Sequence, residues 1–353
     1  MEPTTTQTTQ VFVRLANAQT GPNAMPVTET EILQTLRAIV LSYWPKRKND
    51  YFPGPQPVSL ERRDLFKLRK FPYLACVKSN GMRFMMLCST INEQNKCYMI
   101  DRAFRFYEVE QCFDKAIYTN TLFDGELVFL TDKKLWTYVI HDCISFRGND
   151  VSQKNFNQRY SHVTTVIETF WDYVEPENNN DEKLSLFPIE IKKFIEFSKL
   201  NDLVEMEKNG EISHPTDGII FTPIGLPIGS NAQYTLFKWK PLELHTFDFK
   251  ITYNDGKYTA MVNKKGNLIP FASVDQDLPQ GVKFKEKLEA IENPSYESGA
   301  IVECEYDTKD QCFNPKLIRT DKTHPNGLYT VEKTLLNIQE DISIKELTNL
   351  KLF

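Results

Sequence analysis

The chain of 353 residues is poor in the features that mark several specialised protein classes. Its seven cysteines include no CxxC pair, so we expect neither a disulfide-stapled secreted domain nor a cysteine zinc site. No run approaches the roughly 18–20 apolar residues of a membrane-crossing helix. The first residues also lack the basic-then-apolar pattern of a secretory signal. We therefore expect a soluble intracellular protein with reduced thiols.

The chain also lacks an excess of positive charge. It has 42 Lys plus Arg against 47 Asp plus Glu, which gives a formal net charge of -5. This balance argues against a protein that coats nucleic acid by charge alone, although a local basic cleft is compatible with it. No internal repeat is visible, and at about 150 residues per domain the length predicts roughly two domains.

Periodic apolar residues predict the elements of the first part of the chain. A helix is expected from Thr28, with Glu31 completing a capping box. Successive strands are expected over 73–107, 122–130 and 135–144, because these stretches are rich in apolar and aromatic residues and are separated by turn residues. This order predicts a sheet-rich domain that begins with a helix.

The second part of the chain continues with mixed patterns. Helical spacing is seen over 189–207, and strands are expected at 218–222 and 234–239. Many short strand candidates then follow over 241–328, a length and rhythm suited to an OB-fold barrel. The segment 331–350 returns to helical periodicity.

The string KSNGMR at 78–83 places a lysine at the end of an apolar strand, before a tight turn and an arginine. A lysine in apolar surroundings near other cations loses its proton more readily, and the neutral amine is a nucleophile. Taken alone, this string is better explained as a hairpin turn with an exposed lysine.

Further strings follow in a defined order, and the order is more informative than any single string. They are IDR at 100–102, FDGEL at 123–127, HD at 141–142, TDGII at 216–220, LFKWKP at 236–241 and RTDK at 319–322. The series resembles the covalent nucleotidyltransferase superfamily, and within it the mRNA capping guanylyltransferases. It looks most like the short stand-alone enzymes of large DNA viruses that infect algae. The resemblance runs from about residue 53 to the C-terminus and includes PGPQPVSLERRDL, GAIVEC and VEKTLLNI.

The resemblance implies an α+β fold in two domains. Residues 1–240 would form a nucleotidyltransferase domain of the DNA-ligase-like, ATP-grasp-like type, with antiparallel sheets, and the C-terminal helix 329–353 would join it. Residues 241–328 would form an OB-fold, and the nucleotide would bind between the two domains.

The resemblance also implies a chemistry centred on Lys78. Its amine would attack the α-phosphorus of GTP, expel pyrophosphate and carry GMP, which a 5′-diphosphate RNA would then take as a cap. Lys238 and Lys240 would supply positive charge at the α-phosphate, since residues two apart on a strand share a face.

Other residues would bind the nucleotide and a metal. By the resemblance, Arg102 and Glu126 would hold the ribose, Arg83 would lie beside the nucleotide, and His141 would stack on guanine. Asp217 would help to hold Mg²⁺ or Mn²⁺, because hard cations prefer oxygen ligands.

Arg319, Asp321 and Lys322 resemble the motif that closes onto the β- and γ-phosphates and orients the pyrophosphate. Two positions depart from the family pattern. Asn80 stands where an aspartate is usual, and His141 stands where relatives place an aromatic ring.

Two alternatives stay open: an ATP-dependent polynucleotide ligase, and a nucleotide- or RNA-binding capping subunit that has lost its chemistry, for which Asn80 is the suspicious feature. The length leaves no room for an added triphosphatase or cap methyltransferase domain, so we expect separate proteins for those steps. We expect the protein inside a host cell, in the cytoplasm or nucleus, or in the virion, and without a membrane partner.

Overall fold

The computed structural model describes residues 12–45, 51–173, 184–229, 231–291, 299–320 and 322–351. The chain forms two compact units, which we describe separately. The first is built from residues 1–58, 66–239 and 350–353, and the second from residues 59–65 and 240–349. The second unit thus contains residues 329–349, whereas the sequence predicts that the C-terminal helix 329–353 joins the first domain. The domain boundary between residues 240 and 241 stays a prediction.

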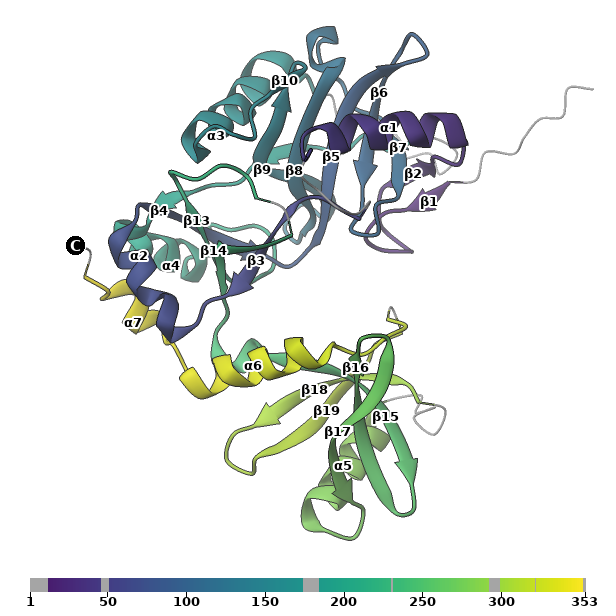
Figure 1. Ribbon diagram of the computed structural model, residues 1–353, viewed down its shortest axis with the longest axis vertical. Coiled ribbons are helices and arrows are strands. Elements are labelled where there is room, and N and C mark those ends of the chain that lie inside the picture. Colours follow the sequence, from purple (N-terminus) through teal and green to yellow (C-terminus); the bar gives the residue numbers. More distant parts are fainter. Residues whose placement is uncertain are drawn as a thin grey trace, which may run out of the picture. The chain divides into compact units, whose positions relative to one another are not determined.

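The first unit contains a large, mainly antiparallel sheet (Figure 1). Its strands are β1 (Val13–Arg14), β2 (Asn23–Pro26), β5 (Met82–Ile91), β6 (Gln94–Ile100), β7 (Phe106–Val109), β8 (Thr119–Leu130), β9 (Leu135–Phe146), β10 (Asn149–Asp150) and β11 (Ile189–Ile191). Their order is β1-β2-β7-β6-β5-β8-β9-β10, and β11 pairs in parallel with β9. The predicted strands over 73–144 are confirmed.

Alternation of side chains along β5 divides the apolar residues between two cores, one on each face of this sheet. Phe84 and Met86 belong to the first core, together with Val163 of α3 (Phe156–Thr165). Met85 and Leu87 belong to the second core. Helix α1 (Thr30–Ser42) covers this second face with its buried Leu36 and Val40, as its position in Figure 1 shows.

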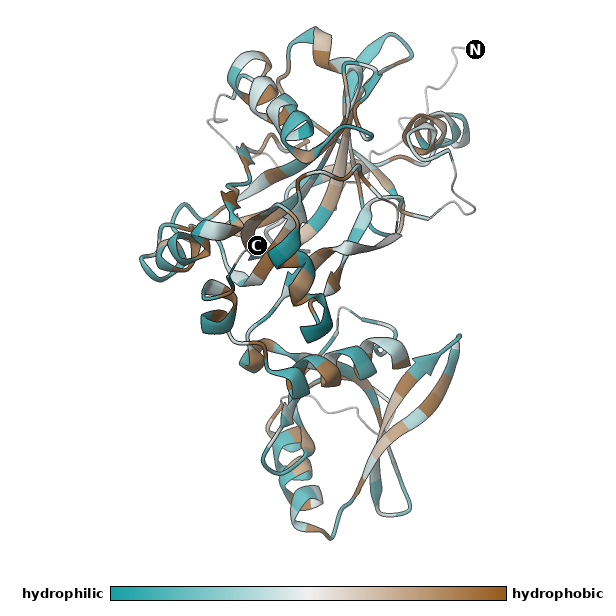
Figure 2. Cartoon of the chain, turned by 60° about the vertical axis from the view of Figure 1, so that its left-hand side comes forward, coloured by the Kyte–Doolittle hydropathy of each residue, from teal (hydrophilic) through white to brown (hydrophobic). Residues whose placement is uncertain are grey.

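A smaller sheet completes the first unit. Its strands are β3 (Pro55–Ser59), β4 (Tyr73–Ser79), β12 (Ile195–Glu196), β13 (Thr216–Pro223) and β14 (Asn231–Trp239). Their order is β12-β4-β13-β14-β3. Helix α4 (Leu200–Lys208) packs against β4, and α2 (Leu65–Lys70) immediately precedes β4. Figure 2 shows hydrophilic and hydrophobic residues on the same helices. These helices are amphipathic, as expected for helices that lie between a core and solvent.

The second unit is a five-stranded antiparallel sheet with three helices. Its elements are β15 (Thr246–Asn254), β16 (Lys257–Lys264), β17 (Asn267–Asp275), α5 (Pro279–Ala290), β18 (Ile301–Asp307), β19 (Cys312–Ile318), α6 (Leu328–Glu340) and α7 (Ile344–Thr348). The strand order in the sheet is β17-β16-β15-β18-β19, and helix α5 lies between β17 and β18 along the chain. This is the topology of an OB-fold. Val331 and Ile338 of α6 are buried in its core.

Two local predictions are wrong. The segment 189–207 begins as β11 and β12, and only its end forms α4, because Ile189 and Ile191 pair with β9 and the apolar spacing serves a sheet. Helix α1 begins at Thr30 after Glu29, whose side chain makes no capping hydrogen bond, so Thr28 and Glu31 form no capping box. The genuine capping box, Asn155 with Gln158 at α3, was not predicted.

The described helices include none that is long and apolar enough to cross a membrane. All seven cysteines are free thiols, as expected.

Candidate active site

Lys78 lies at the end of β4, just before the turn into β5. Its Nζ is 2.6 Å from Oδ1 of Asp217, and both side chains are mostly buried. The turn is held by the amide of Asn80, which donates to the carbonyl of Pro215 at 2.8 Å. A Cβ on Gly81 would lie 2.5 Å from a backbone oxygen of β8, so only glycine fits there.

A β-bulge in β13 aims Asp217 at Lys78. The pairing of β13 with β4 shifts register between Thr216 and Ile219. Gly218, inside the bulge, has a φ of 142°, which side-chain-bearing residues rarely adopt. The string TDG therefore has a structural reason: the glycine permits the bulge, and the bulge brings the carboxylate to the lysine.

The strand register places Lys238 on the same face of the small sheet as Lys78. Cys76 of β4 pairs with Ile220 of β13, which pairs with Lys238 of β14. Paired residues share a face, and so do residues two apart on one strand. Lys240 follows β14 and is grouped with the second unit, so its place at the nucleotide stays a prediction.

Strands β5, β8 and β9 contribute a second group of polar side chains. Arg83 pairs across the strands with Glu126 and contacts Asp124 in a bidentate ion pair, with Nε to Oδ1 at 2.9 Å and Nη2 to Oδ2 at 2.5 Å. Nε2 of His141 lies 3.5 Å from Oδ1 of Asp124. Burial lowers the pKa of His141, which favours the neutral ring. Asp124 is fully buried and thus orients both neighbours.

The electrostatics join these two groups into one site. Burial raises the pKa of Glu126, and the charges of Lys192, Lys78 and Arg83 oppose that effect. Arg102 is exposed in the loop after β6. Its guanidinium interacts electrostatically with Arg83, which repels it, and with Glu126, which attracts it. The structure therefore links Lys78 to Asp217 and to Glu126, and Glu126 in turn to Arg83 and Arg102.

Lys192 is a site residue that the sequence did not reveal. It is 7% exposed, and its ammonium donates to Oγ of Ser79, the residue after Lys78. The hydroxyl of Ser79 lies 2.8 Å from Nε2 of His214, so it can donate a hydrogen bond to that nitrogen when the ring carries its hydrogen on Nδ1. Burial, assisted by the charge of Lys192, lowers the pKa of His214 to about 4. The helical interpretation of 189–207 concealed this lysine, and no motif indicates it.

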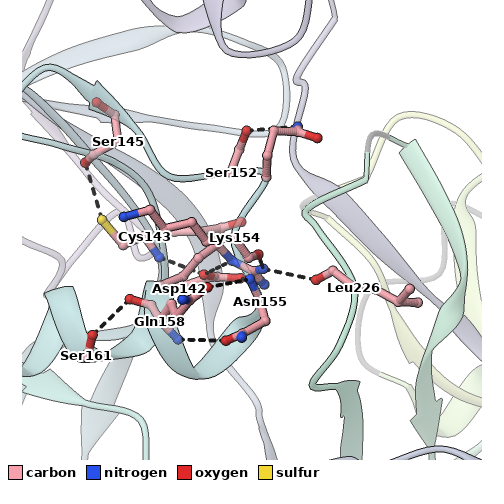
Figure 3. A network of polar contacts seen from close by, with 12 residues as sticks. Asp142, Cys143, Ser145, Ser152, Lys154, Asn155, Gln158, Ser161 and Leu226 are labelled. Carbon is pink, nitrogen blue, oxygen red and sulfur yellow. Dashed lines mark hydrogen bonds and ion pairs between the residues drawn. The ribbon is translucent and has the colours of Figure 1, made fainter.

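A buried ion pair supports β9 behind His141. Arg159 of α3 contacts Asp142 through two nitrogens, each at 2.9 Å, and also donates to the carbonyls of Lys154 and Leu226. Figure 3 shows this network around Asp142, with the capping residues of α3 beside it. It ties α3, β9 and the loop between β13 and β14 to one another.

In the second unit, Arg319 and Lys322 share one carboxylate, that of Asp248 on β15. Asp321 lies outside the described residues. No motif in the sequence points to Asp248, which lies 71 residues before Arg319 in the chain.

A metal ion would find one suitable ligand in the first unit. Within the described part of the chain, no group of three His, Cys, Asp or Glu side chains is arranged to hold a metal. The carboxylate of Asp217 is a hard oxygen ligand at the predicted position, and phosphate oxygens of a nucleotide would complete the coordination of Mg²⁺ or Mn²⁺. The donor set thus fits a metal that binds together with its substrate.

Comparisons with known proteins cover both units. A family model described as mRNA capping enzyme, catalytic domain, matches residues 21–242, and one described as mRNA capping enzyme, C-terminal domain, matches residues 244–348. The α+β nucleotidyltransferase fold with a C-terminal OB-fold type domain is thus confirmed. The DNA ligase D of a mycobacterium, complexed with ATP and MES, aligns over 76% of this chain and 95% of its own, at 12% identity and with a TM-score of 0.41.

The relatives are cellular proteins. The chain is 30% identical to the mRNA-capping enzyme subunit alpha of Kluyveromyces lactis, over 84% of this chain and 76% of that protein. It is 28% identical to the mRNA-capping enzyme of Danio rerio, over 83% of this chain and 48% of that protein. With both family models matched in sequence order and a relative at this identity, the chain belongs to the mRNA capping enzyme family.

Proposed function

We propose that the chain is a GTP:RNA guanylyltransferase whose nucleophile is Lys78. The observation that carries the proposal is the ion pair of Lys78 with Asp217, beside Glu126, which interacts with the charges of both Lys78 and Arg83. The membership of the mRNA capping enzyme family supports it.

The reaction would proceed in two displacements at phosphorus. The neutral amine of Lys78 attacks the α-phosphorus of GTP, a phosphorus–nitrogen bond forms, and the bond to pyrophosphate breaks. A terminal phosphate oxygen of a 5′-diphosphate RNA then attacks the same phosphorus, which releases Lys78 and leaves the 5′-5′ triphosphate cap. Each step requires charge on the phosphoryl oxygens to be stabilised, and cations do this best in a partly dry site.

The side chains have distinct tasks in this scheme. Lys238, on the face of Lys78, would neutralise the α-phosphate, and Lys240 would assist it. Arg83, held by Asp124, would lie beside the nucleotide. The Nζ of Lys78 lies 2.6 Å from Oδ1 of Asp217, so the amine would have to leave this contact to attack the α-phosphorus.

Other assignments concern the base, the ribose and the metal. Arg102 and Glu126 would hold the ribose, and His141 would stack on the base as a neutral ring. Mg²⁺ or Mn²⁺ on Asp217 would supply positive charge to the phosphates.

The buried donors beside Lys78 explain why the base would be guanine. Lys192 presents an ammonium in a nearly dry position; it donates one hydrogen bond to Ser79 and keeps further N–H donors. Guanine carries a carbonyl oxygen at position 6, which would accept from this ammonium, whereas adenine carries an amino group there, a donor that would leave the remaining N–H groups unpaired. An unpaired buried donor costs about 1–3 kcal/mol, more when it is charged.

This base preference separates the proposal from an ATP-dependent ligase. The inactive-subunit alternative rests on Asn80, which replaces the usual aspartate. The Asn80 side chain is exposed, and its backbone N–H still donates the hydrogen bond that holds the turn. The backbone that presents Lys78 is therefore intact without the usual aspartate.

The test is a covalent labelling experiment. Protein is incubated with α-labelled GTP or ATP and a divalent metal, denatured, and examined for retained label. We expect label from GTP that is stable in alkali and labile in acid, absent in Lys78→Ala and present in Lys115→Ala, a control at an exposed lysine. Label from ATP alone would establish a ligase, and label from neither would establish a binding subunit.

Three narrower assignments rest on the same activity. The Kluyveromyces relative is named a subunit alpha, and we propose that RNA triphosphatase and cap methyltransferase reside in separate proteins. Release of the γ-phosphate from triphosphate-ended RNA by the purified chain would contradict this.

The order of the sequence motifs supports a viral stand-alone enzyme that acts inside the host cell, where transcripts are made. Mapping its gene to a viral genome would test that assignment.

A further inference from the structure

We propose that Asp248 is a positioning residue that holds Arg319 and Lys322 in place for the pyrophosphate of GTP. The inference deepens the proposed function and rests on it, because those two cations matter only if a nucleoside triphosphate is the substrate. It is argued within the second unit alone.

A single buried carboxylate bridges the two cations. Asp248 lies on β15 and is 6% exposed. Its Oδ1 accepts from Nη1 of Arg319 at 3.0 Å, and its Oδ2 accepts from Nζ of Lys322. Because both oxygens of one rigid group are used, the distance between the guanidinium and the ammonium is fixed by the carboxylate.

Asn326 locks Asp248 in turn. Its Nδ2 donates to Oδ2 of Asp248 at 3.2 Å, and its Oδ1 accepts from the amide of Asp248 at 2.9 Å. The amide of Asn326 also donates to the carbonyl of Asp248 at 2.7 Å. With a contact on the side chain and two on the backbone, the carboxylate cannot rotate without losing hydrogen bonds.

Glu303 provides an internal comparison. Its Oε2 lies 2.9 Å from Nη1 of Arg319, and no contact of Glu303 with Lys322 is described. Asp248 therefore differs from Glu303 in that it couples two cations, whereas Glu303 supports one. The formal charges of these four side chains cancel, so the cluster is stable without an anion.

Such a fixed pair suits a pyrophosphate group. Lys and Arg side chains lose rotamer entropy when they are ordered, and binding must otherwise overcome this cost. A guanidinium has five donors and an ammonium three, so each can contact a carboxylate and a phosphate oxygen at once. Holding both in advance lowers the entropic cost of orienting the leaving group in line with the attacking amine.

Loss of this positioning should affect the loading of GMP onto Lys78 and not its transfer to RNA. Pyrophosphate is present while GMP is loaded onto Lys78, and it is absent when GMP passes to RNA. A loss of positioning should therefore slow loading and leave transfer unchanged, whereas a general loss of structure should slow both.

The experiment compares Asp248→Asn with the wild type in two single-turnover assays. Asp310→Asn, an aspartate half exposed on the same unit, is the matched control. Loading is followed as covalent GMP, and transfer is followed from isolated adduct to 5′-diphosphate RNA, after long incubation to load the slow variant. We expect loading to fall by about 100-fold in Asp248→Asn, as for misplacement of a reacting group, with equal transfer, and no change in Asp310→Asn.

Glu303→Gln should slow loading less than Asp248→Asn does. Should Asp248→Asn fail to fold, Asn326→Ser keeps all four charges but loosens the carboxylate, and it should slow loading with equal transfer. Unchanged loading in the folded variant, or an equal slowing of both steps, overturns the inference. Absence of any adduct in the wild type overturns the proposed function instead, and the inference with it.

Discussion

The ammonium of Lys78 and a carboxylate oxygen of Asp217 are 2.6 Å apart. The pair joins β4 to the bulge of β13, so the proposed nucleophile and the proposed metal ligand are in direct contact. In the proposed reaction the carboxylate would have two successive partners, the lysine and then the cation.

Asp217→Asn should abolish metal-dependent loading while leaving the fold intact, since an amide still accepts a hydrogen bond from Lys78 but is a poor ligand for a hard cation. We expect the rate of covalent GMP formation to fall by about 100-fold or more at saturating GTP and to respond only weakly to added Mn²⁺. Asp202→Asn, on the exposed surface of α4, is the control and should behave as wild type. A normal metal response in Asp217→Asn would remove this residue from the metal site.

Lys192→Met should weaken the preference for GTP over ATP. Methionine has a similar volume and needs no partner, so the site loses its buried donor without gaining an unpaired charge. We expect the ratio of the two loading rates to fall by about 10- to 100-fold, chiefly through slower loading with GTP. Lys193→Met, the neighbouring lysine, is the control. An unchanged ratio would show that the base is recognised elsewhere.

His214 should make the protein less stable in mild acid. Its pKa in the folded state is about 4, against an ordinary value of 6.5, because burial penalises the charged ring. The unfolded state therefore binds a proton first, and the stabilisation present above pH 6.5 is lost as the pH falls toward 4. His214→Gln should show a flatter decline of the free energy of unfolding over this range, measured by denaturant titration at several pH values. Equal slopes in the two proteins would contradict the assignment.

Breaking the buried pair of Arg159 with Asp142 should be costly. Arg159→Met leaves the carboxylate without its main partner, and we expect a loss of about 3–5 kcal/mol in the free energy of unfolding. The double variant Arg159→Met with Asp142→Leu should recover part of this loss, because no buried charge is left. A double variant less stable than the single one would indicate that the network around Leu226 and Lys154 carries the stability instead.

Asn80→Asp should restore the usual family residue with little effect on stability. The side chain is exposed, and surface substitutions away from special features usually stay within about 0.5 kcal/mol. We expect the thermal midpoint to be unchanged and covalent loading to remain measurable in both forms. Loading seen only in Asn80→Asp would show that the natural chain is the inactive subunit.

The sequence alone predicted the strands over 73–144 and most of the residues of the candidate site. The candidate site includes two short strings whose backbone conformation depends on nearby residues. Gly81 permits the tight turn after Lys78, and Gly218 permits the bulge that follows Asp217. Neighbouring residues satisfy such requirements, so a series of short strings in the right order was enough to identify the family and to predict the nucleophile.

Only the tertiary structure decided which distant side chains meet. Lys192 reaches Ser79 because Ile189 and Ile191 pair with β9, and the same apolar spacing fits a helix equally well when no partner strand is known. Asp248 reaches Arg319 because β15 and β19, which ends just before Arg319, both pair with β18 in the second unit. The physical reason is common to both: a buried charge is tolerated only beside its partner, and that partner is set by strand register rather than by separation along the chain.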